Sequence, residues 1–298
     1  MVTRRQYVRN WWDLSRGANV VWGISTIALG AVMVGVDYGD NLFTLGLHAF
    51  CIGAFIAGWF AINDLLDIEV DRINHPQRPL PAENISELSA KKYGHRMMIL
   101  SGVAMLAIIL NDGGMEWVDS AAVWFVALLL MIAYEMDGKP FNPCLKKRMF
   151  WGNLTIAATM SITILFGAAA IDHALDPLLW LVAAAACVLT TAREMAMDTR
   201  DQVGDFDRNT YAKVKGDEKA HKVIWILSVA ASLLLTLPFF LEYLPIKLIV
   251  FVLPSIIFAL ATRKHLVRKD EGRAGDMLRF SMVFGLAGLA ACGIIINW

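Results

Sequence analysis

The stretch "NDLLDIEVDRINHPQRPLP", residues 63–81, decides what kind of fold this chain can have. Its aspartates Asp64, Asp67 and Asp71 come at steps of three and four, directly after an apolar run. On a helix, Asn63, Asp67 and Asp71 fall within about 80° of one another. Asp64 lies close to the same arc, so the residues alone leave open whether Asn63 or Asp64 faces a ligand. The stretch predicts a row of oxygen ligands where an apolar helix ends.

The composition indicates that this helix lies in a lipid membrane. Of the 298 residues, 57% are hydrophobic and only 18% are charged, a balance typical of a membrane protein. The formal net charge is zero, so a basic surface for nucleic acid is not expected. The four cysteines and six histidines show no paired spacing, so the sequence predicts neither a zinc site nor a disulfide framework.

Apolar runs of about the length of a membrane span recur along the whole chain. They predict an all-α polytopic membrane protein with nine transmembrane helices in a bundle. The expected spans are approximately 17–36, 42–63, 96–111, 117–135, 150–171, 176–196, 221–242, 245–262 and 278–297.

The basic residues predict the orientation of this bundle. When the connections are numbered alternately, 26 of the 27 Lys and Arg residues fall on one side, and Lys247 is the exception. Such asymmetry is the positive-inside signature. We therefore expect an integral protein of the cell membrane with a cytoplasmic N-terminus, an outer C-terminus and its functional site toward the cytoplasmic face.

The aspartate pattern occurs twice. Asp198, Asp201 and Asp205 repeat the spacing of the first set at an offset of 134 residues, again after an apolar span. This predicts a single domain made of two four-helix repeats, about 17–149 and 150–262, followed by a ninth helix at about 278–297.

Two acidic rows favour a metal site over a solvated helix end, although one row alone fits a solvated helix end better. Hard oxygen ligands without histidine or thiolate are those that Mg²⁺ or Ca²⁺ prefers, and Mg²⁺ commonly shares its shell with a phosphate. Cations adjoin both rows, and such cations would neutralise a bound diphosphate. They are Arg72, Arg78, Arg200, Arg208 and the "LKKR" of residues 145–148.

At this point the motifs resemble a known family. The stretch 63–81 resembles the first aspartate-rich motif of the UbiA superfamily of membrane prenyltransferases, and "REMAMDTRDQVGD" at 193–205 resembles the second. The segment "LKKRMFWGN" at 145–153 is similar to the cytoplasmic loop and fifth-helix entry of that superfamily. The resemblance covers nearly the whole chain and implies transfer of a prenyl group from a prenyl diphosphate, with Mg²⁺ bridging both acidic motifs.

The resemblance also implies roles for individual positions, with Arg78 and Lys146 on diphosphate oxygens and Asn19 and Tyr134 in the pocket. The expected metal ligands are Asn63, Asp67, Asp71, Asp198, Asp201 and Asp205. The candidate catalytic residues are Asp67, Asp71, Asp201, Asp205 and Lys146. The candidate substrate-binding residues are Asn19, Arg72, Arg78, Tyr134, Lys146, Asn153 and Arg200.

The molecule that accepts the prenyl group is the partner that the sequence specifies least. The first motif, "GN" at 152–153 and "RE" at 193–194 are most similar to the branch that adds geranylgeranyl to geranylgeranylglyceryl phosphate, a membrane lipid. Glu83 and Met197 depart from the family pattern, so an aromatic quinone precursor or a chlorophyll-type acceptor stays open. An alternative of another class is a cation-coupled transporter, in which acidic residues line an ion path. No obligate protein partner is predicted.

Overall fold

The computed structural model describes residues 3–111, 117–138, 142–202 and 208–297. Within these ranges the regular structure is helical, without a strand, and an isolated bridge pairs Arg148 with Asn209. The expected all-α fold is therefore confirmed over the described residues.

The helices follow one another with short connections. In the first half of the chain they are α1 (Arg4–Leu14), α2 (Gly17–Met33), α3 (Tyr38–Leu66), α4 (Ile68–Asn74), α5 (Glu87–Asn111) and α6 (Trp117–Glu135). In the second half they are η1 (Leu145–Lys147), α7 (Met149–Ser161), α8 (Thr163–Ala169), α9 (Pro177–Arg200), α10 (Tyr211–Lys215), α11 (Asp217–Phe240), η2 (Ile246–Phe251), α12 (Leu253–Val267) and α13 (Glu271–Asn297).

Among the described residues, seven helical segments are long and apolar enough to cross a membrane. They belong to α3, α5, α6, the run α7–α8, α9, α11 and α13. The expected first span corresponds to α2, an apolar helix of 17 residues, and the expected eighth to the 15 residues of α12 with η2 before them. The structure thus gives an all-helical membrane bundle with seven clear spanning candidates, and not the full set of nine.

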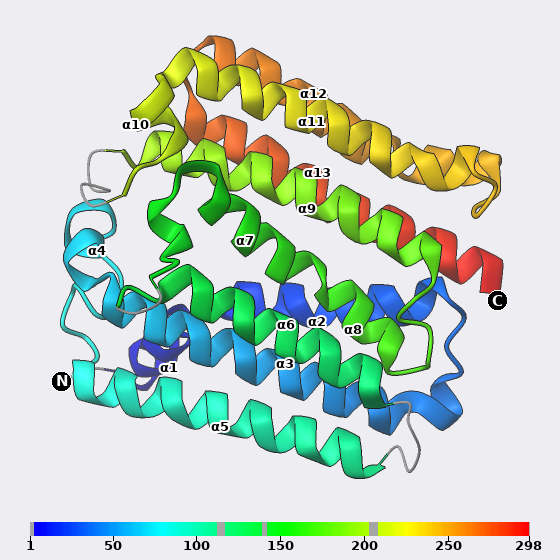
Figure 1. Ribbon diagram of the computed structural model, residues 1–298, viewed down its shortest axis with the longest axis horizontal. Coiled ribbons are helices and arrows are strands. Elements are labelled where there is room, and N and C mark those ends of the chain that lie inside the picture. Colours follow the sequence, from blue (N-terminus) through cyan, green and yellow to red (C-terminus); the bar gives the residue numbers. More distant parts are fainter. Residues whose placement is uncertain (1–2, 112–116, 139–141, 203–207, 298) are drawn as a thin grey trace.

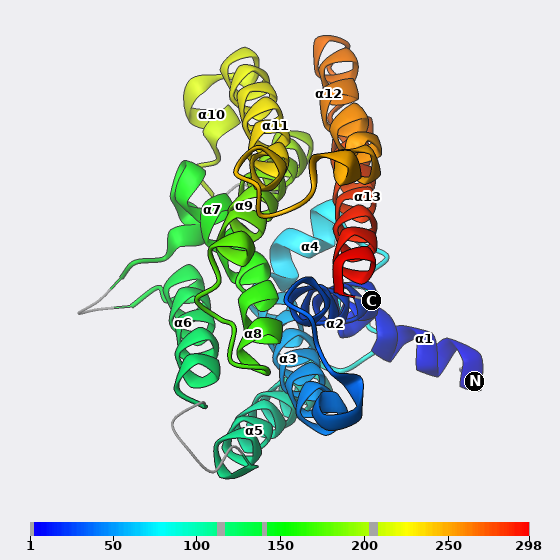
Figure 2. The ribbon, with the colours of Figure 1, turned by 90° about the vertical axis from the view of Figure 1, so that its right-hand side faces the viewer.

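The long helices lie side by side along one direction, and the polar connections gather at one end (Figure 1). The short helices α4 and α10 lie at that end, which is also the end of the N-terminus. Figure 2 shows α1 projecting from the side of the bundle. This helix leaves Tyr7, Val8 and Trp12 more than half exposed beside its arginines, a composition typical of helices that lie in the membrane interface.

The two halves of the bundle meet most closely where α2 crosses α8. A Cβ atom added at Gly30 would collide with the backbone carbonyl of Ile164, and one added at Gly167 would collide with the backbone of Ile27. Small residues allow such close approach between membrane helices, where dispersion contacts replace the hydrophobic effect as the driving force. The largest core cluster continues from this crossing into α9, α11 and α13.

Two helix boundaries differ from the expectation. The third span begins at Glu87 and not near residue 96, because the charged residues from Lys91 to Arg96 extend α5 beyond its apolar part while Ala90 and Gly94 pack inward. Asn74, Pro76, Pro79 and Pro81 predict a helix break after Asp71. The break comes after Asn74, where His75 ends α4 and Pro76 follows. A further break, which the sequence did not indicate, separates α3 from α4 at Asp67.

The second aspartate of the first motif and the second aspartate of the other motif each follow the end of a long helix. Asp67 is the residue after α3 and has φ −98° and ψ 14°, while Asp201 is the residue after α9 and has φ −90° and ψ 11°. The residues alone leave open whether the second row continues on a helix as far as Asp205. Helix α9 ends at Arg200, and Asp205 itself lies outside the described residues.

Candidate active site

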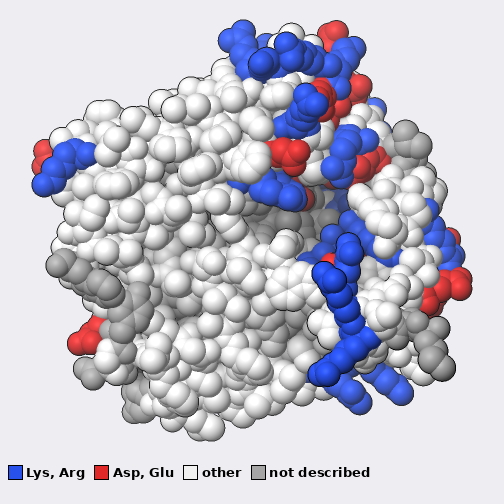
Figure 3. Space-filling view, turned by 180° about the vertical axis from the view of Figure 1, so that it is seen from behind, with Lys and Arg blue, Asp and Glu red and all other residues white. Residues whose placement is uncertain are grey.

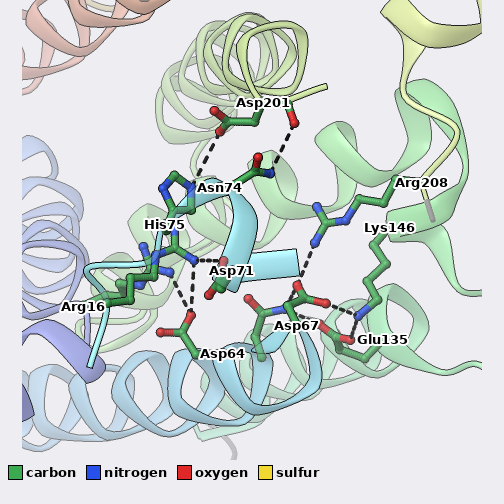
Figure 4. A network of polar contacts seen from close by, with 12 residues as sticks. Arg16, Asp64, Asp67, Asp71, Asn74, His75, Glu135, Lys146, Asp201 and Arg208 are labelled. Atoms are coloured by element: carbon green, nitrogen blue, oxygen red, sulfur yellow. Dashed lines mark hydrogen bonds and ion pairs between the residues drawn. The ribbon is translucent and has the colours of Figure 1, made fainter. Parts of the chain in front are cut away.

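Asp67 is the centre of the polar network at the charged end of the bundle (Figure 4). Lys146 Nζ donates to Asp67 Oδ1 at 3.0 Å, and Arg208 Nη2 donates to Asp67 Oδ2 at 2.7 Å. Asn63 Nδ2, one helical turn earlier, also donates to Oδ2 at 3.0 Å. Because α3 ends at Asp67, its carboxylate points out of the helix end toward donors from three parts of the chain.

Glu135, the last residue of α6, is a member of this network that sequence reasoning missed. Its carboxylate accepts hydrogen bonds from Lys146 Nζ and, at 2.5 Å, from Asn63 Nδ2. Its side chain is only 8% exposed. Burial alone would lower the pKa of Lys146, but the carboxylates of Asp67 and Glu135 outweigh burial and raise that pKa above its usual value. Lys146 is therefore held as a cation between two carboxylates.

A second group of charges lies beside the first. Arg78 forms an ion pair with Asp71 and lies 3.9 Å from Asp64 Oδ1, while Arg16 Nη2 donates to the same Asp64 oxygen at 2.8 Å. Arg16 joins α1 to α2 in a left-handed conformation with φ 49°, and its guanidinium lies over the ring of Phe60. Sequence reasoning did not select Arg16. Asp64 therefore faces this second group, whereas Asn63 faces Asp67.

The second motif lies across from α4. Asn74 Nδ2 donates to the backbone carbonyl of Asp201 at 3.2 Å, and His75 Nε2 lies 3.8 Å from Asp201 Oδ2. Arg200 donates to both carboxylate oxygens of Asp201 at 2.7 Å, and Asn153 Nδ2 donates to Asp198 Oδ2 at 2.7 Å. The structure thus brings the two aspartate motifs, 134 residues apart in the chain, to one site.

The other predicted residues lie at different distances from this network. Tyr134 is buried in the bundle, and Asn19 is half-buried at the start of α2, three residues after Arg16. Arg72 pairs at 2.5 Å with Glu69, whose side chain is 69% exposed, so this arginine is occupied at the surface. Arg72 therefore takes no part in the polar contacts that the described residues make around Asp67.

The oxygen atoms of the site fit a hard divalent cation. Asp71 Oδ2 is buried and has no hydrogen-bond partner among the described residues, a state that costs about 1–3 kcal/mol. Burial raises the pKa of Asp71 above its usual range in spite of Arg78. Over the described ranges, no three Asp, Glu, His or Cys side chains already converge on one point, because Lys and Arg pair with the carboxylates. A divalent cation would compete for these carboxylates and satisfy the lone oxygen.

Comparison with known proteins identifies the family. Residues 23–285 match the UbiA prenyltransferase family. The chain belongs to this family. The resemblance inferred from the two motifs is thereby confirmed, and this UbiA chain is a prenyltransferase of the membrane.

Relatives of this UbiA prenyltransferase match along almost its full length. A digeranylgeranylglyceryl phosphate synthase of Saccharolobus solfataricus is 31% identical over 294 residues, which cover 94% of this chain and 95% of the relative. A second one, of Methanosphaera stadtmanae, is 28% identical over 83% of this chain and 84% of its own.

Solved structures share the fold of this prenyltransferase. One that concerns digeranylgeranylglyceryl phosphate synthase in membranes has a TM-score of 0.70 at 22% identity, covering 97% of this chain and 99% of its own. A UbiA homologue from Archaeoglobus fulgidus bound to GPP and Mg²⁺ has a TM-score of 0.65 at 18% identity, covering 94% of this chain and 99% of its own. The helical bundle is therefore a UbiA fold.

Proposed function

We propose that this UbiA prenyltransferase transfers a geranylgeranyl group from its diphosphate to geranylgeranylglyceryl phosphate and releases diphosphate. The observation that carries the proposal is the meeting of both aspartate motifs beside two separate groups of cations, around Lys146 and around Arg16. Two anionic substrates require two such groups. Full-length relatives named for this reaction support the choice of acceptor.

The diphosphate would bind at the Asp67 group with Mg²⁺. The residues that would hold Mg²⁺ are Asn63, Asp67, Asp71, Asp198, Asp201 and the expected sixth ligand Asp205. When bound, Mg²⁺ supplies Lewis-acid stabilisation of the charge that develops on the leaving diphosphate. Lys146 and Arg208 already lie at Asp67, and their donors would hold diphosphate oxygens that the metal leaves free. A homologue that binds GPP together with Mg²⁺ supports this arrangement.

The reaction then needs the acceptor hydroxyl beside the prenyl carbon. The hydroxyl oxygen forms an ether bond to that carbon, the hydroxyl proton is released, and the carbon–oxygen bond to diphosphate breaks. Both lipid tails stay among apolar helices, and the apolar bundle excludes the water that would otherwise capture an allylic cation. The charged end of the molecule borders a largely uncharged surface, as Figure 3 shows, and many large hydrophobic side chains are exposed. Such a surface suits substrates with a polar head and an apolar tail.

The phosphate of the acceptor would bind between Arg16, Arg78 and His75. Arg16 Nε is buried without a hydrogen-bond partner among the described residues, so this guanidinium has a donor left for a ligand. Burial, together with the nearby Arg78, lowers the pKa of His75 to about 4. His75 is therefore neutral near pH 7 and can donate one N–H bond to a phosphate. Two arginines and a neutral histidine form a small anion site next to the metal ligands.

We expect Arg16→Gln to raise the KM for the phosphate acceptor by about 10-fold to 100-fold, because a hydrogen bond to a charged group contributes about 1.5–3 kcal/mol. The KM for prenyl diphosphate should change by less than about 2-fold, since Lys146 and Arg208 stay in place. Steady-state kinetics with each substrate varied in turn measures both. The matched control is Arg9→Gln in α1, whose side chain is 80% exposed. An equal rise in both KM values would contradict the assignment.

Glu135→Gln should lower kcat/KM for prenyl diphosphate by about 10-fold to 100-fold, as is common when the partner of a ligand-holding residue is lost. The amide can still accept from Asn63 but no longer fixes the Lys146 cation by charge. Glu135→Asp keeps the charge and should recover part of the loss, which a purely structural role would not predict. Initial rates at saturating Mg²⁺ test this expectation, and an unchanged rate for Glu135→Gln would refute it.

The product decides between acceptors. Purified protein is incubated with geranylgeranyl diphosphate, Mg²⁺ and either geranylgeranylglyceryl phosphate or an aromatic quinone precursor, and the products are analysed by mass and linkage. An ether of the lipid phosphate supports the proposal. A prenyl carbon bonded to a ring would establish the aromatic alternative, and diphosphate release without any prenylated product would reject both.

The finer topology is also a proposal. We infer nine spans, with α2 and η2–α12 added to the seven clear candidates, in two repeats of about 17–149 and 150–262 and a ninth helix at about 278–297. The matching conformations of Asp67 and Asp201 after α3 and α9 support the repeats. The basic connections favour a cytoplasmic N-terminus, an outer C-terminus and an active site on the cytoplasmic side.

A further inference from the structure

A separate groove of about 310 Å³ lies between α11 and α12. The hydrogen bond from Gln202 Nε2 to Asp217 Oδ1, at 2.9 Å, ties the start of α11 to the segment after α9, so the groove lies at the aspartate end of the bundle. Of the candidate metal ligands that the structure describes, none lines it. Its lining residues are Glu218, His221, Lys222, Trp225, Arg263, Leu266, Val267 and Lys269.

The groove carries an excess of positive charge. Among the described residues, Lys222, Arg263 and Lys269 have no carboxylate within 4 Å. Glu271, on α13, is already paired with His221 at 2.8 Å. The remaining carboxylate of the lining is that of Glu218, against three cations. Because three cations face one carboxylate in the described lining, the groove should attract an anion.

The cations are held by the local structure. The guanidinium of Arg263 lies 5.5 Å from the ring centre of Trp225, an arrangement that fixes the plane of the donors. Lys269 follows the end of α12 in the left-handed conformation, with φ 55°. The turn around it is closed by hydrogen bonds of 3.0 Å from Lys269 N to Leu266 O and from Asp270 N to His265 O. Glycine usually occupies such a position, so a lysine there is held at a cost in backbone energy.

The groove also lies where apolar surface gives way to charge. Ile226 on α11 and Ile257 and Leu260 on α12 are exposed large apolar residues, as expected of helix faces that contact lipid. Arg263 and Lys264 follow on α12, and Figure 3 shows Lys and Arg side chains gathered at one end of a largely uncharged surface. Tryptophan is enriched at this level of a membrane, and Trp225 fits that place.

We propose that this groove binds the phosphate headgroup of an anionic membrane phospholipid. Arg263, Lys222 and Lys269 would donate to the phosphate oxygens, and the lipid chain would run from there over the exposed Ile226 and Leu260, toward the apolar part of α11 and α12. Basic pockets between transmembrane helices on the cytoplasmic side recognise anionic headgroups by this chemistry. The described lining holds one carboxylate, that of Glu218, which is too few to hold Mg²⁺ with a diphosphate, so we assign the groove a ligand other than the prenyl donor. The proposal does not depend on the acceptor of the reaction.

Native mass spectrometry of the purified full-length protein in a neutral detergent tests the proposal. Phosphatidylglycerol and phosphatidylcholine with the same chains are titrated in parallel. We expect the wild type to retain phosphatidylglycerol preferentially. The double variant Lys222→Gln, Arg263→Gln should lose about 30-fold in affinity for phosphatidylglycerol, at about 5-fold per basic residue near a membrane surface. Affinity for phosphatidylcholine should stay the same in both proteins.

A matched control separates a specific site from general charge. Lys91→Gln, Lys92→Gln removes two exposed lysines of α5 at the same end of the bundle, away from the groove. An equal loss in this control, or no loss in the groove variant, would overturn the proposal. Arg263→Lys keeps the charge without the planar donors and should bind with intermediate affinity. Displacement of phosphatidylglycerol by millimolar inorganic phosphate alone would assign the groove to a soluble anion and also overturn the lipid assignment.

Discussion

Replacing Asp67 with asparagine is expected to lower the turnover of prenyl transfer by about 100-fold to 1,000-fold, the size of effect seen when one group that stabilises transition-state charge is removed. Asp67 is the point on which Lys146, Arg208 and Asn63 converge. The asparagine would lose a charged ligand for Mg²⁺ and would leave two cations of the site without their shared carboxylate.

The control for this variant is Glu69→Gln, which removes a carboxylate from the same short segment. Glu69 is 69% exposed and contacts exposed Arg72, so its loss should change the rate by less than about 2-fold. Both proteins are compared by initial rates at saturating prenyl diphosphate, after their thermal unfolding temperatures have been matched against the wild type. Turnover of the Asp67 variant within about 5-fold of the wild type would remove Asp67 from the proposed chemistry.

Removal of divalent cations is expected to abolish activity, and addition of Mg²⁺ should restore it fully. Asp71 keeps one buried oxygen without a partner, and the raised pKa of its carboxyl reflects a charge that burial disfavours. A metal shared by the carboxylates and the diphosphate would satisfy that oxygen and stabilise the leaving group.

The measurement is product formation in excess EDTA, followed by titration with Mg²⁺. Thermal unfolding of the same samples provides a second readout, since a ligand that binds only the folded state raises the unfolding temperature. Diphosphate and Mg²⁺ together should raise it more than either does alone. Full product formation in excess EDTA would disprove the metal requirement.

The parts of the site that repeat could be predicted from the sequence. Asp67 and Asp201 stand out because each is the middle residue of a set of three aspartates with the same spacing, and each set follows an apolar run. Such a repeat can be recognised from the sequence alone. Arg16 and Glu135 could not be found in this way. They reach the site across 48 and 72 residues, to Asp64 and Asn63 respectively. Arg16 stands just before an apolar run and Glu135 at the end of one, and neither belongs to a repeated pattern.

The fold, like the site, could be predicted from the sequence only in part. Hydropathy locates the apolar part of a helix, so it places α5 but misses its charged first turns from Glu87. It equally gives no sign of the break at Asp67, because the break is a change in the backbone conformation of one residue, with φ −98° and ψ 14°. The hydrogen bonds from Asp67 N to Asn63 O and from Asp71 N to Asp67 O are kept on either side of it. Such boundaries depend on which side chains pack or bond at a turn, and this is decided by distant residues.

The placement of α1 has a consequence for how a lipid substrate is found. This helix exposes Tyr7, Val8 and Trp12 and leads directly into Arg16, the residue proposed to bind the acceptor phosphate. A helix that rests in the headgroup layer holds that arginine at the depth where membrane lipids carry their own phosphates. An acceptor can then reach the site by diffusion in two dimensions, with its head already at the correct height. The enzyme would capture it sideways from the bilayer, and the tail would never have to enter water.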